Sequence, residues 1–146
     1  MEKFKKSFFL LSLFIITVIS SFGQRQRDDS LAKVIKEIAY NNVYEVSYTV
    51  GIAGAISQQL QRFDMLLSLS TNDQLLNLAT HNKSAVVRLY AFQALKRKKI
   101  EIPSTIIQQF QNDNTIVATL NACVVDKKRV STLAQQNIKS FADFSN

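Results

Sequence analysis

The residue types that most often carry out chemistry are sparse in this sequence. His81 is the only histidine and Cys123 the only cysteine among 146 residues. A nucleophilic cysteine needs a neighbouring base, and we favour a buried Cys123 that acts as a small apolar residue over a pairing with His81. A zinc or iron–sulfur site built from His and Cys needs about four such ligands. The carboxylates are scattered rather than paired. We therefore expect a protein with no catalytic residue, no metal and no cofactor.

Two runs of basic residues are the strongest candidates for a binding site. They are Lys96, Arg97, Lys98 and Lys99, and Lys127, Lys128 and Arg129. We favour solvated ends that aid solubility, since the first run follows a predicted helix C-terminus, where the helix dipole favours cations. The alternative is one basic patch for an anionic partner such as an acidic protein, lipopolysaccharide or a phospholipid headgroup. Nucleic acid is not expected as a partner, because no aromatic residues interleave the first run as stacking platforms.

The N-terminal segment follows the pattern of a secretory signal peptide. Lysines near the start precede an apolar run over residues 8–19, and the small residues Ser21 and Gly23 are spaced as at a cleavage site. We expect cleavage near Gly23/Gln24, so that residues 1–23 are a signal peptide and the remainder is exported, to the periplasm or beyond. The alternative is an uncleaved anchor, although the run is shorter than the roughly 20 residues of a membrane span.

The spacing of apolar residues predicts an all-α fold. Apolar residues recur three and four positions apart, as on the buried face of a helix, and the chain has only 3 glycines and 1 proline. The expected helices cover residues 30–41, 57–69, 72–80 and 85–98, a short stretch after Pro103, and residues 115–124 and 130–141. Thr71 and Gln74 form a capping-box pattern, and Ser84 caps the helix over 85–98. That helix is apolar almost all round and is expected to be the innermost one.

Residues 43–56 depart from helical spacing. Strand-forming residues such as Val46, Tyr48 and Val50 alternate there, but a single strand has no expected partner elsewhere in the chain. We therefore predict an extended or irregular connection. The expected organisation is a signal peptide, an N-terminal helix with this connection over residues 24–56, and a helical domain over residues 57–146.

Residues 81–95 resemble a HEAT repeat, in which a polar turn leads into a second helix that begins with Val-Arg and continues with small residues and Leu. The matching residues are Val87, Arg88, Ala91, Ala94 and Leu95. Residues 103–124 resemble a second, degenerate unit. The resemblance implies a short stack of about two helical hairpins, with the helices over 30–41 and 130–141 as caps. The whole sequence resembles the small secreted HEAT-repeat proteins of bacteria.

Arg88 and Asn82 are assigned a structural role. The turn of a HEAT repeat usually carries Asp at the position that Asn82 occupies here. Asn is neutral, so this position offers Arg88 no opposite charge. The guanidinium has several donors in a fixed fork, and we expect them to bond turn carbonyls or the Asn82 side chain. A direct functional role for Arg88 is the less favoured alternative.

These observations predict a non-enzymatic interaction or scaffold domain that is exported to the cell envelope and binds another protein. The alternative is a binder of anionic envelope surfaces, lipid headgroups or lipopolysaccharide, through the basic runs. The formal net charge of +7 is compatible with either, and part of it belongs to the signal segment. No motif in the sequence identifies the partner protein.

Overall fold

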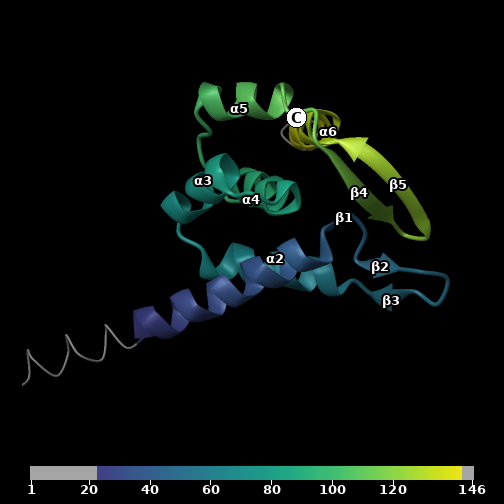
Figure 1. Ribbon diagram of the computed structural model, residues 1–146, viewed down its shortest axis with the longest axis horizontal. Coiled ribbons are helices and arrows are strands. Elements are labelled where there is room, and N and C mark those ends of the chain that lie inside the picture. The colour runs from purple at the N-terminus through teal and green to yellow at the C-terminus, as the bar shows by residue number, and fades with distance from the viewer. Residues whose placement is uncertain (1–22, 143–146) are drawn as a thin grey trace, which may run out of the picture.

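The structure is a computed structural model that describes residues 23–142, so the predicted signal peptide at residues 1–23 lies outside them except for Gly23. Helices alternate with two small sheets (Figure 1). After a helix over residues 23–41, the elements are β1 (Val43–Glu45), β2 (Thr49–Val50), β3 (Ala55–Ile56), α2 (Gln58–Leu69), α3 (Asn72–His81), α4 (Ala85–Arg97), α5 (Ser104–Gln111), β4 (Ile116–Asn121), β5 (Val124–Arg129) and α6 (Val130–Ala142). The fold is α+β, so the prediction of an all-α fold is wrong.

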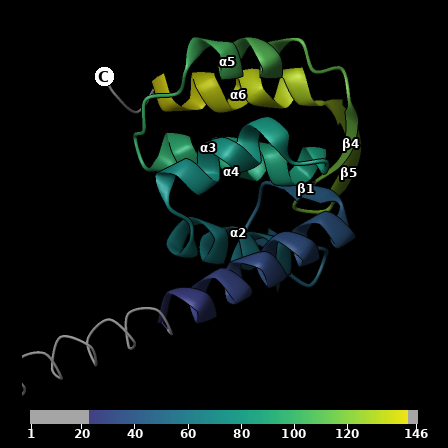
Figure 2. The same cartoon turned by 60° about the vertical axis from the view of Figure 1, so that its left-hand side comes forward.

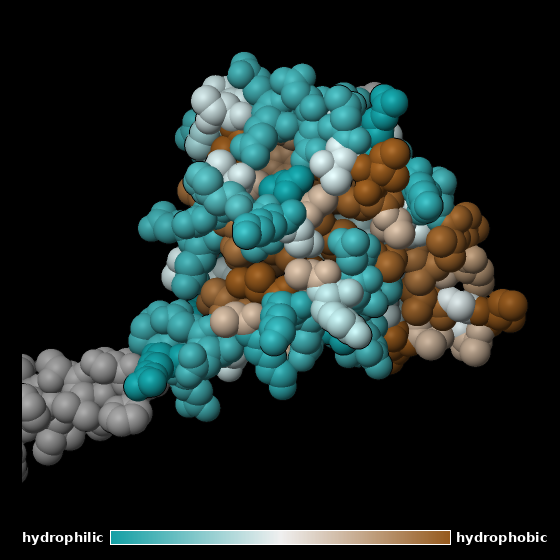
Figure 3. All heavy atoms as spheres, in the orientation of Figure 1, coloured by the Kyte–Doolittle hydropathy of each residue, from teal (hydrophilic) through white to brown (hydrophobic). Residues whose placement is uncertain are grey.

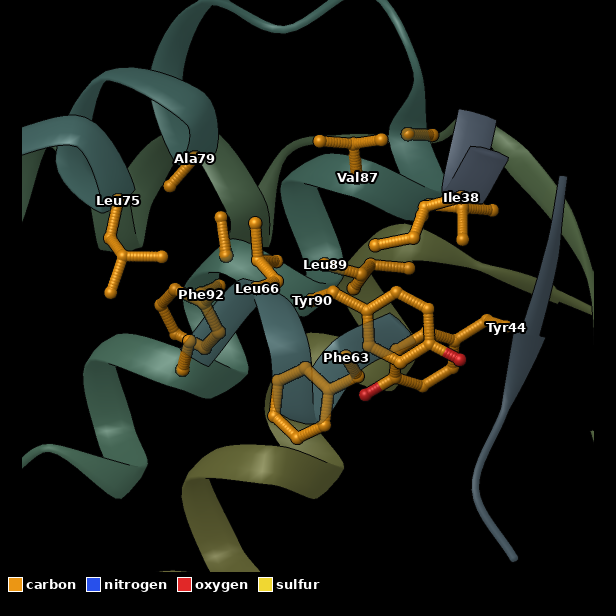
Figure 4. Close-up of a cluster of buried hydrophobic side chains, with 14 of the residues drawn as sticks. Ile38, Tyr44, Phe63, Leu66, Leu75, Ala79, Val87, Leu89, Tyr90 and Phe92 are labelled. Carbon is orange, nitrogen blue, oxygen red and sulfur yellow. The ribbon is translucent and has the colours of Figure 1, made fainter. Parts of the chain in front are cut away.

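The helices pack in pairs, one pair upon the next (Figure 2). α3 and α4 form the middle pair, the N-terminal helix and α2 lie on one side of it, and α5 and α6 lie on the other. The innermost helix is α4, as predicted, because most of its side chains are buried. Tyr90, Phe92 and Leu95 have no exposed surface, and Figure 4 shows how Tyr90 and Phe92 meet side chains from the flanking helices.

Capping residues begin the helices where the sequence predicted. Thr71 accepts a hydrogen bond from the Gln74 N–H at 3.2 Å, and the Gln74 side chain accepts one from the Thr71 N–H at 2.9 Å. This reciprocal pair is the predicted capping box of α3. Ser84 likewise accepts from the Val87 N–H and caps α4. The predicted helices over 57–69, 72–80, 85–98 and 130–141 are confirmed to within a few residues.

The larger sheet joins two distant parts of the chain. Its strand order is β1-β4-β5, with β1 parallel to β4 and β5 antiparallel to it. The prediction of a helix over residues 115–124 is wrong, because the side chains there alternate instead of following a helical face. Val117 and Thr119 are buried, whereas Ile116 is 64% exposed, which is the pattern of a half-buried strand.

Residues 43–56 form more than an irregular connection. β1 finds the partner that the sequence did not reveal, with Tyr44 opposite Thr119 of β4. β2 and β3 then pair with each other as a short hairpin. The predicted stack of HEAT-like hairpins with capping helices is therefore wrong at two connections, because strands follow both the N-terminal helix and α5. Both strand insertions emerge at the same end of the helix pairs (Figure 1).

Candidate interaction surface

The β4–β5 hairpin turns through Ala122 and Cys123 and exposes apolar side chains near that turn. Asn121 pairs with Val124 on either side of it, and Ala122 has a φ of 51°. Val124 is 65% exposed and Val125 is 74% exposed. Cys123 is exposed at the turn, so the expectation that it lies buried in a helical stripe is wrong.

The β2–β3 hairpin lies against the tip of the β4–β5 hairpin. Gly51 and Gly54 make its tight turn with φ values of 74° and 64°, which glycine adopts without steric cost. The Gly51 N–H donates to the carbonyl oxygen of Ala122 at 3.0 Å, and the Ser47 hydroxyl donates to the Asn121 side chain at 2.6 Å. These bonds hold the two turns side by side.

We call residues 50–56 and 121–125 the hairpin tips. Neither segment contains a charged residue. Ile52 is fully exposed and Ile56 is 65% exposed, so aliphatic side chains from both tips meet solvent. Figure 3 shows hydrophobic residues gathered over this end of the molecule, where the two hairpins project. Exposed apolar patches of this kind mark interaction sites more often than isolated exposed apolar residues do.

Buried tyrosines fix the base of the sheet. The Tyr90 hydroxyl accepts a hydrogen bond from the Glu45 N–H at 2.9 Å and donates one to the Glu45 carbonyl at 3.0 Å. The Tyr44 hydroxyl donates to Gln93 at 3.2 Å and accepts from Asn137 at 3.0 Å. The Tyr44 and Tyr90 rings lie 4.8 Å apart, and Figure 4 shows them together beside β1. Burial raises the pKa of Tyr44 to about 12 and raises that of Tyr90 further, so both stay neutral donors.

An open groove of about 1000 Å³ lies beside the β2–β3 hairpin. The N-terminal helix and the start of α2 form its walls, with Val50 and Ile56 contributed by the hairpin. Charges of both signs line it, and Arg62 pairs with Glu37 there at 3.1 Å. Because the lining is mixed in charge, the groove does not select an ion of one sign. It extends the apolar surface of the tips into a concave wall.

Two residues of the first basic run, Arg97 and Lys98, pack α4 against α2. Arg97 lies 4.9 Å from the Phe63 ring centroid and pairs with Asp64 at 3.5 Å. Lys98 donates to the Ser70 carbonyl at 2.8 Å, and Lys99 follows with a positive φ of 55°. The run lies at a helix C-terminus, where the helix dipole favours cations, as the sequence predicted, and Lys98 is the C-cap residue of α4.

The second basic run lies on a different element, β5. Lys127 and Arg129 are exposed, and Lys128 is half-buried with Asp126 at 3.9 Å. Residues 126–129 belong to this strand and pair with β4. The second run therefore stands directly beside the tip residue Val125, whereas the first run belongs to the contact between α4 and α2.

Arg88 connects the turn before α4 to the turn after α5. It donates to the Asn82 carbonyl at 2.9 Å and to the Lys83 carbonyl at 3.3 Å, and it pairs with Asp113 at 2.6 Å. The Asn82 side chain instead accepts from the Ser84 N–H at 2.9 Å. Asp113 was not expected as the charged partner, although its place in an Asn-Asp-Asn turn is a visible signal.

Partial burial by itself would raise the pKa of Asp113. Hydrogen bonds from Thr115, and then from the Arg88 guanidinium, outweigh that effect and hold the pKa of Asp113 below its usual value. The Asp113–Arg88 pair is thus ionised near neutral pH. Its side chains are mostly covered, each with 14% of its surface exposed, which suits a structural link better than a site open to a ligand.

The remaining chemistry-bearing residues are dispersed. His81 ends α3, whereas Cys123 lies at the turn of the β4–β5 hairpin. Within residues 23–142, no group of three or more His, Cys, Asp or Glu side chains is placed to hold a metal ion. The same part of the chain contains no helix that combines the length and apolar character needed to cross a bilayer.

Comparison with known proteins gives no further guide to the site. No protein-family model matches the chain, and no curated protein matches it. The candidate surface therefore stands on its geometry. The hairpin tips were not predicted from the sequence, although a visible signal marks them. They lie within stretches of 16 and 12 residues without charge, residues 46–61 and 114–125, which is unusual for surface segments.

Proposed function

We propose that this protein is a non-enzymatic interaction module of the cell envelope that binds another protein through the hairpin tips. The full exposure of Ile52, on a turn hydrogen-bonded to a second apolar turn, carries the proposal. The folded chain leaves this apolar side chain in solvent, so the free energy of burying it is available only to binding a partner. The signal-like segment at residues 1–23 supports export of the module.

The energetics favour a surface of this composition as an anchor. Burying one Val or Ile side chain contributes about 1.5–3 kcal/mol. Ile52, Ile56, Val124 and Val125 are 65–100% exposed, so together they offer about 5–9 kcal/mol on that scale, which is of the same order as an association cost of about 4–15 kcal/mol. The tips are held in place by the Gly51–Ala122 and Ser47–Asn121 hydrogen bonds, so less ordering is needed on binding.

Site-specific photo-crosslinking in an envelope fraction tests this function. A crosslinking side chain at Ile52 or Val124 is expected to give a discrete protein adduct. The matched control carries the same group at Lys83, in the turn between α3 and α4 on another part of the surface. The Ile52→Asp variant, whose change is fully exposed, is expected to keep the fold and abolish the adduct formed from Val124. Equal labelling from all positions, or none from the tips, would contradict the proposal.

A second candidate function is binding to an anionic envelope surface. It is favoured by the position of Lys127 and Arg129, which continue the same strand that exposes Val125 at the tip. Aliphatic side chains beside exposed cations suit a lipid headgroup region. Sedimentation with vesicles of phosphatidylglycerol, compared with vesicles of phosphatidylcholine, tests it. Binding to the anionic vesicles should fall with rising salt, and equal binding to both would count against it.

A further inference from the structure

We propose that the outer edge of β5 is a docking edge, to which an extended acidic segment of a partner protein adds as a further strand. The inference rests on the proposed function and names the chemistry of the partner. It starts from a difference between the two edges of the β1-β4-β5 sheet. One edge is closed by buried side chains, and the other is open.

The β1 edge is closed. Gln59 donates from its side chain to the Val43 carbonyl at 2.9 Å, and Tyr90 bonds both the N–H and the carbonyl of Glu45. Both of these side chains have no exposed surface. The Val43 carbonyl and both main-chain groups of Glu45 are therefore satisfied from within the protein, which blocks the addition of a further strand at this edge.

The β5 edge is open, and the ladder shows which groups face outward. Pairs in an antiparallel ladder alternate between hydrogen-bonded and non-hydrogen-bonded positions. The Leu120 carbonyl accepts from the Val46 N–H at 3.1 Å, so the main chain of Leu120 faces β1, not β5. Its partner Val125, and then Lys127 and Arg129, consequently direct their N–H and carbonyl groups away from β4.

A contact of Lys127 agrees with this alternation. Its N–H donates to the carboxylate of its neighbour Asp126 at 2.7 Å rather than to β4, and an added strand would replace this bond. The strand is six residues long, and all but Lys128 are exposed. A row of outward main-chain groups on an exposed strand is a template for strand addition.

Charge decides which strand fits. Val125, Lys127 and Arg129 are alternate residues and lie on one face of the sheet. Side chains directly opposite one another across a ladder interact, and opposite charges stabilise the pair. The complementary segment carries carboxylates on alternate residues, so that two of them lie opposite the two cations. Its other face meets Asp126 and Lys128, which already pair with each other.

A second copy of this chain complements the charged half of the edge less well than an acidic strand does. Two-fold pairing of β5 with itself, centred on the charged half of the strand, places Asp126 opposite Asp126 or Lys127 opposite Lys127. Like charges directly opposite are destabilising. Lysines on edge strands discourage such self-pairing in other proteins. The same cations favour a partner strand of opposite charge.

Synthetic peptides test the inference with the full chain. The probe is a ten-residue peptide of alternating Glu and Val, and the control peptide alternates Lys and Val. A third peptide repeats the first with N-methyl groups on alternate residues, which block main-chain pairing. Only the unmethylated acidic peptide is expected to bind. Binding is expected to slow amide hydrogen exchange at Val125, Lys127 and Arg129, because their N–H groups are the outward ones.

A charge variant separates the edge from the rest of the surface. Lys127→Glu with Arg129→Glu is expected to weaken binding of the acidic peptide by about tenfold or more, as two favourable pairs become repulsive. The matched control, Lys83→Glu with Arg25→Glu, makes the same change in net charge at exposed positions outside the sheet. That control is expected to bind the peptide within about twofold of the unmodified protein, because neither residue lies on β5.

The inference is overturned if the acidic peptide does not bind at about 1 mM, or if it binds without slowing exchange at the three outward amides. It is also overturned if those amides become protected by raising the protein concentration alone, which would identify a second copy as the occupant. Loss of vesicle binding in the Lys127, Arg129 variant, with no peptide binding, would identify a lipid surface instead. Crosslinking from Ile52 does not depend on these results, so it can support binding through the hairpin tips even where the peptide does not bind β5.

Discussion

Replacing Tyr90 with Phe tests how the base of the sheet is held. The hydroxyl of Tyr90 is the partner of both main-chain groups of Glu45, at 2.9 and 3.0 Å, and its ring has no exposed surface. The substitution removes the hydroxyl and keeps the ring contacts with Phe63 at 5.2 Å and Tyr44 at 4.8 Å. An unsatisfied buried donor or acceptor costs about 1–3 kcal/mol. Because Glu45 is half-buried and water can reach part of it, we expect a total loss of about 2–3 kcal/mol.

Urea unfolding measures this loss as a shift in the midpoint at unchanged slope. A loss of 2–3 kcal/mol with a typical slope lowers the midpoint by about 1–2 M. The matched control is Tyr48→Phe, which removes a hydroxyl that donates to Asp64 at 3.0 Å on the exposed surface. That control is expected to cost less than about 0.5 kcal/mol. If Tyr90→Phe proves no more destabilising than Tyr48→Phe, the double hydrogen bond to Glu45 does not stabilise the sheet.

Three further substitutions probe the core, the link between turns and the hairpin tip. Asp113→Asn should cost about 1–3 kcal/mol at pH 7, read from thermal unfolding. Because the pKa of Asp113 is lowered in the folded protein, its carboxylate adds stability above the unfolded pKa, and this stability is lost as pH falls through the folded pKa. The difference in stability between the variant and the unmodified protein should therefore shrink on acidification. Ala91→Asp places an unpaired charge at a position with no exposed surface and should abolish the helical circular dichroism signal; retention of that signal would show that the core can open there. Gly51→Ala should cost about 1 kcal/mol in urea unfolding, because its φ is 74° although no atom lies within 4 Å of an added Cβ.

The helices were predictable because each carries its own local signals. Thr71, Gln74 and Ser84 cap α3 and α4 through bonds to residues three positions away, so a short window of sequence contains the whole interaction. The apolar character of residues 85–95 likewise predicted the innermost helix without knowledge of its neighbours. Local patterns of this kind determine the type of secondary structure of a segment and the face that it buries.

The sheet was not predictable because its evidence is spread over the chain. Residues 116–121 alternate as a strand, but Ile116, Val117 and Leu120 also fit one face of a helix. The choice between the two depends on β1, whose pairing with β4 no local pattern announces. The hairpin tips were missed for the same reason. Each charge-free segment is visible alone, yet only the folded chain places them together.

The parallel pairing of β1 with β4 has a consequence for the order of folding. Ser47 and Asn121, which bond across the tips, are 74 residues apart in sequence. At a synthesis rate of roughly 5–20 residues per second, β1 waits roughly 4–15 s for the hairpin that completes it. The β4–β5 hairpin closes locally, on a timescale of about microseconds, so it forms first and receives β1 afterwards. Until then, β1 at Val43–Glu45 lacks its partner strand, and a holding chaperone that shields it is expected to raise the yield of native protein.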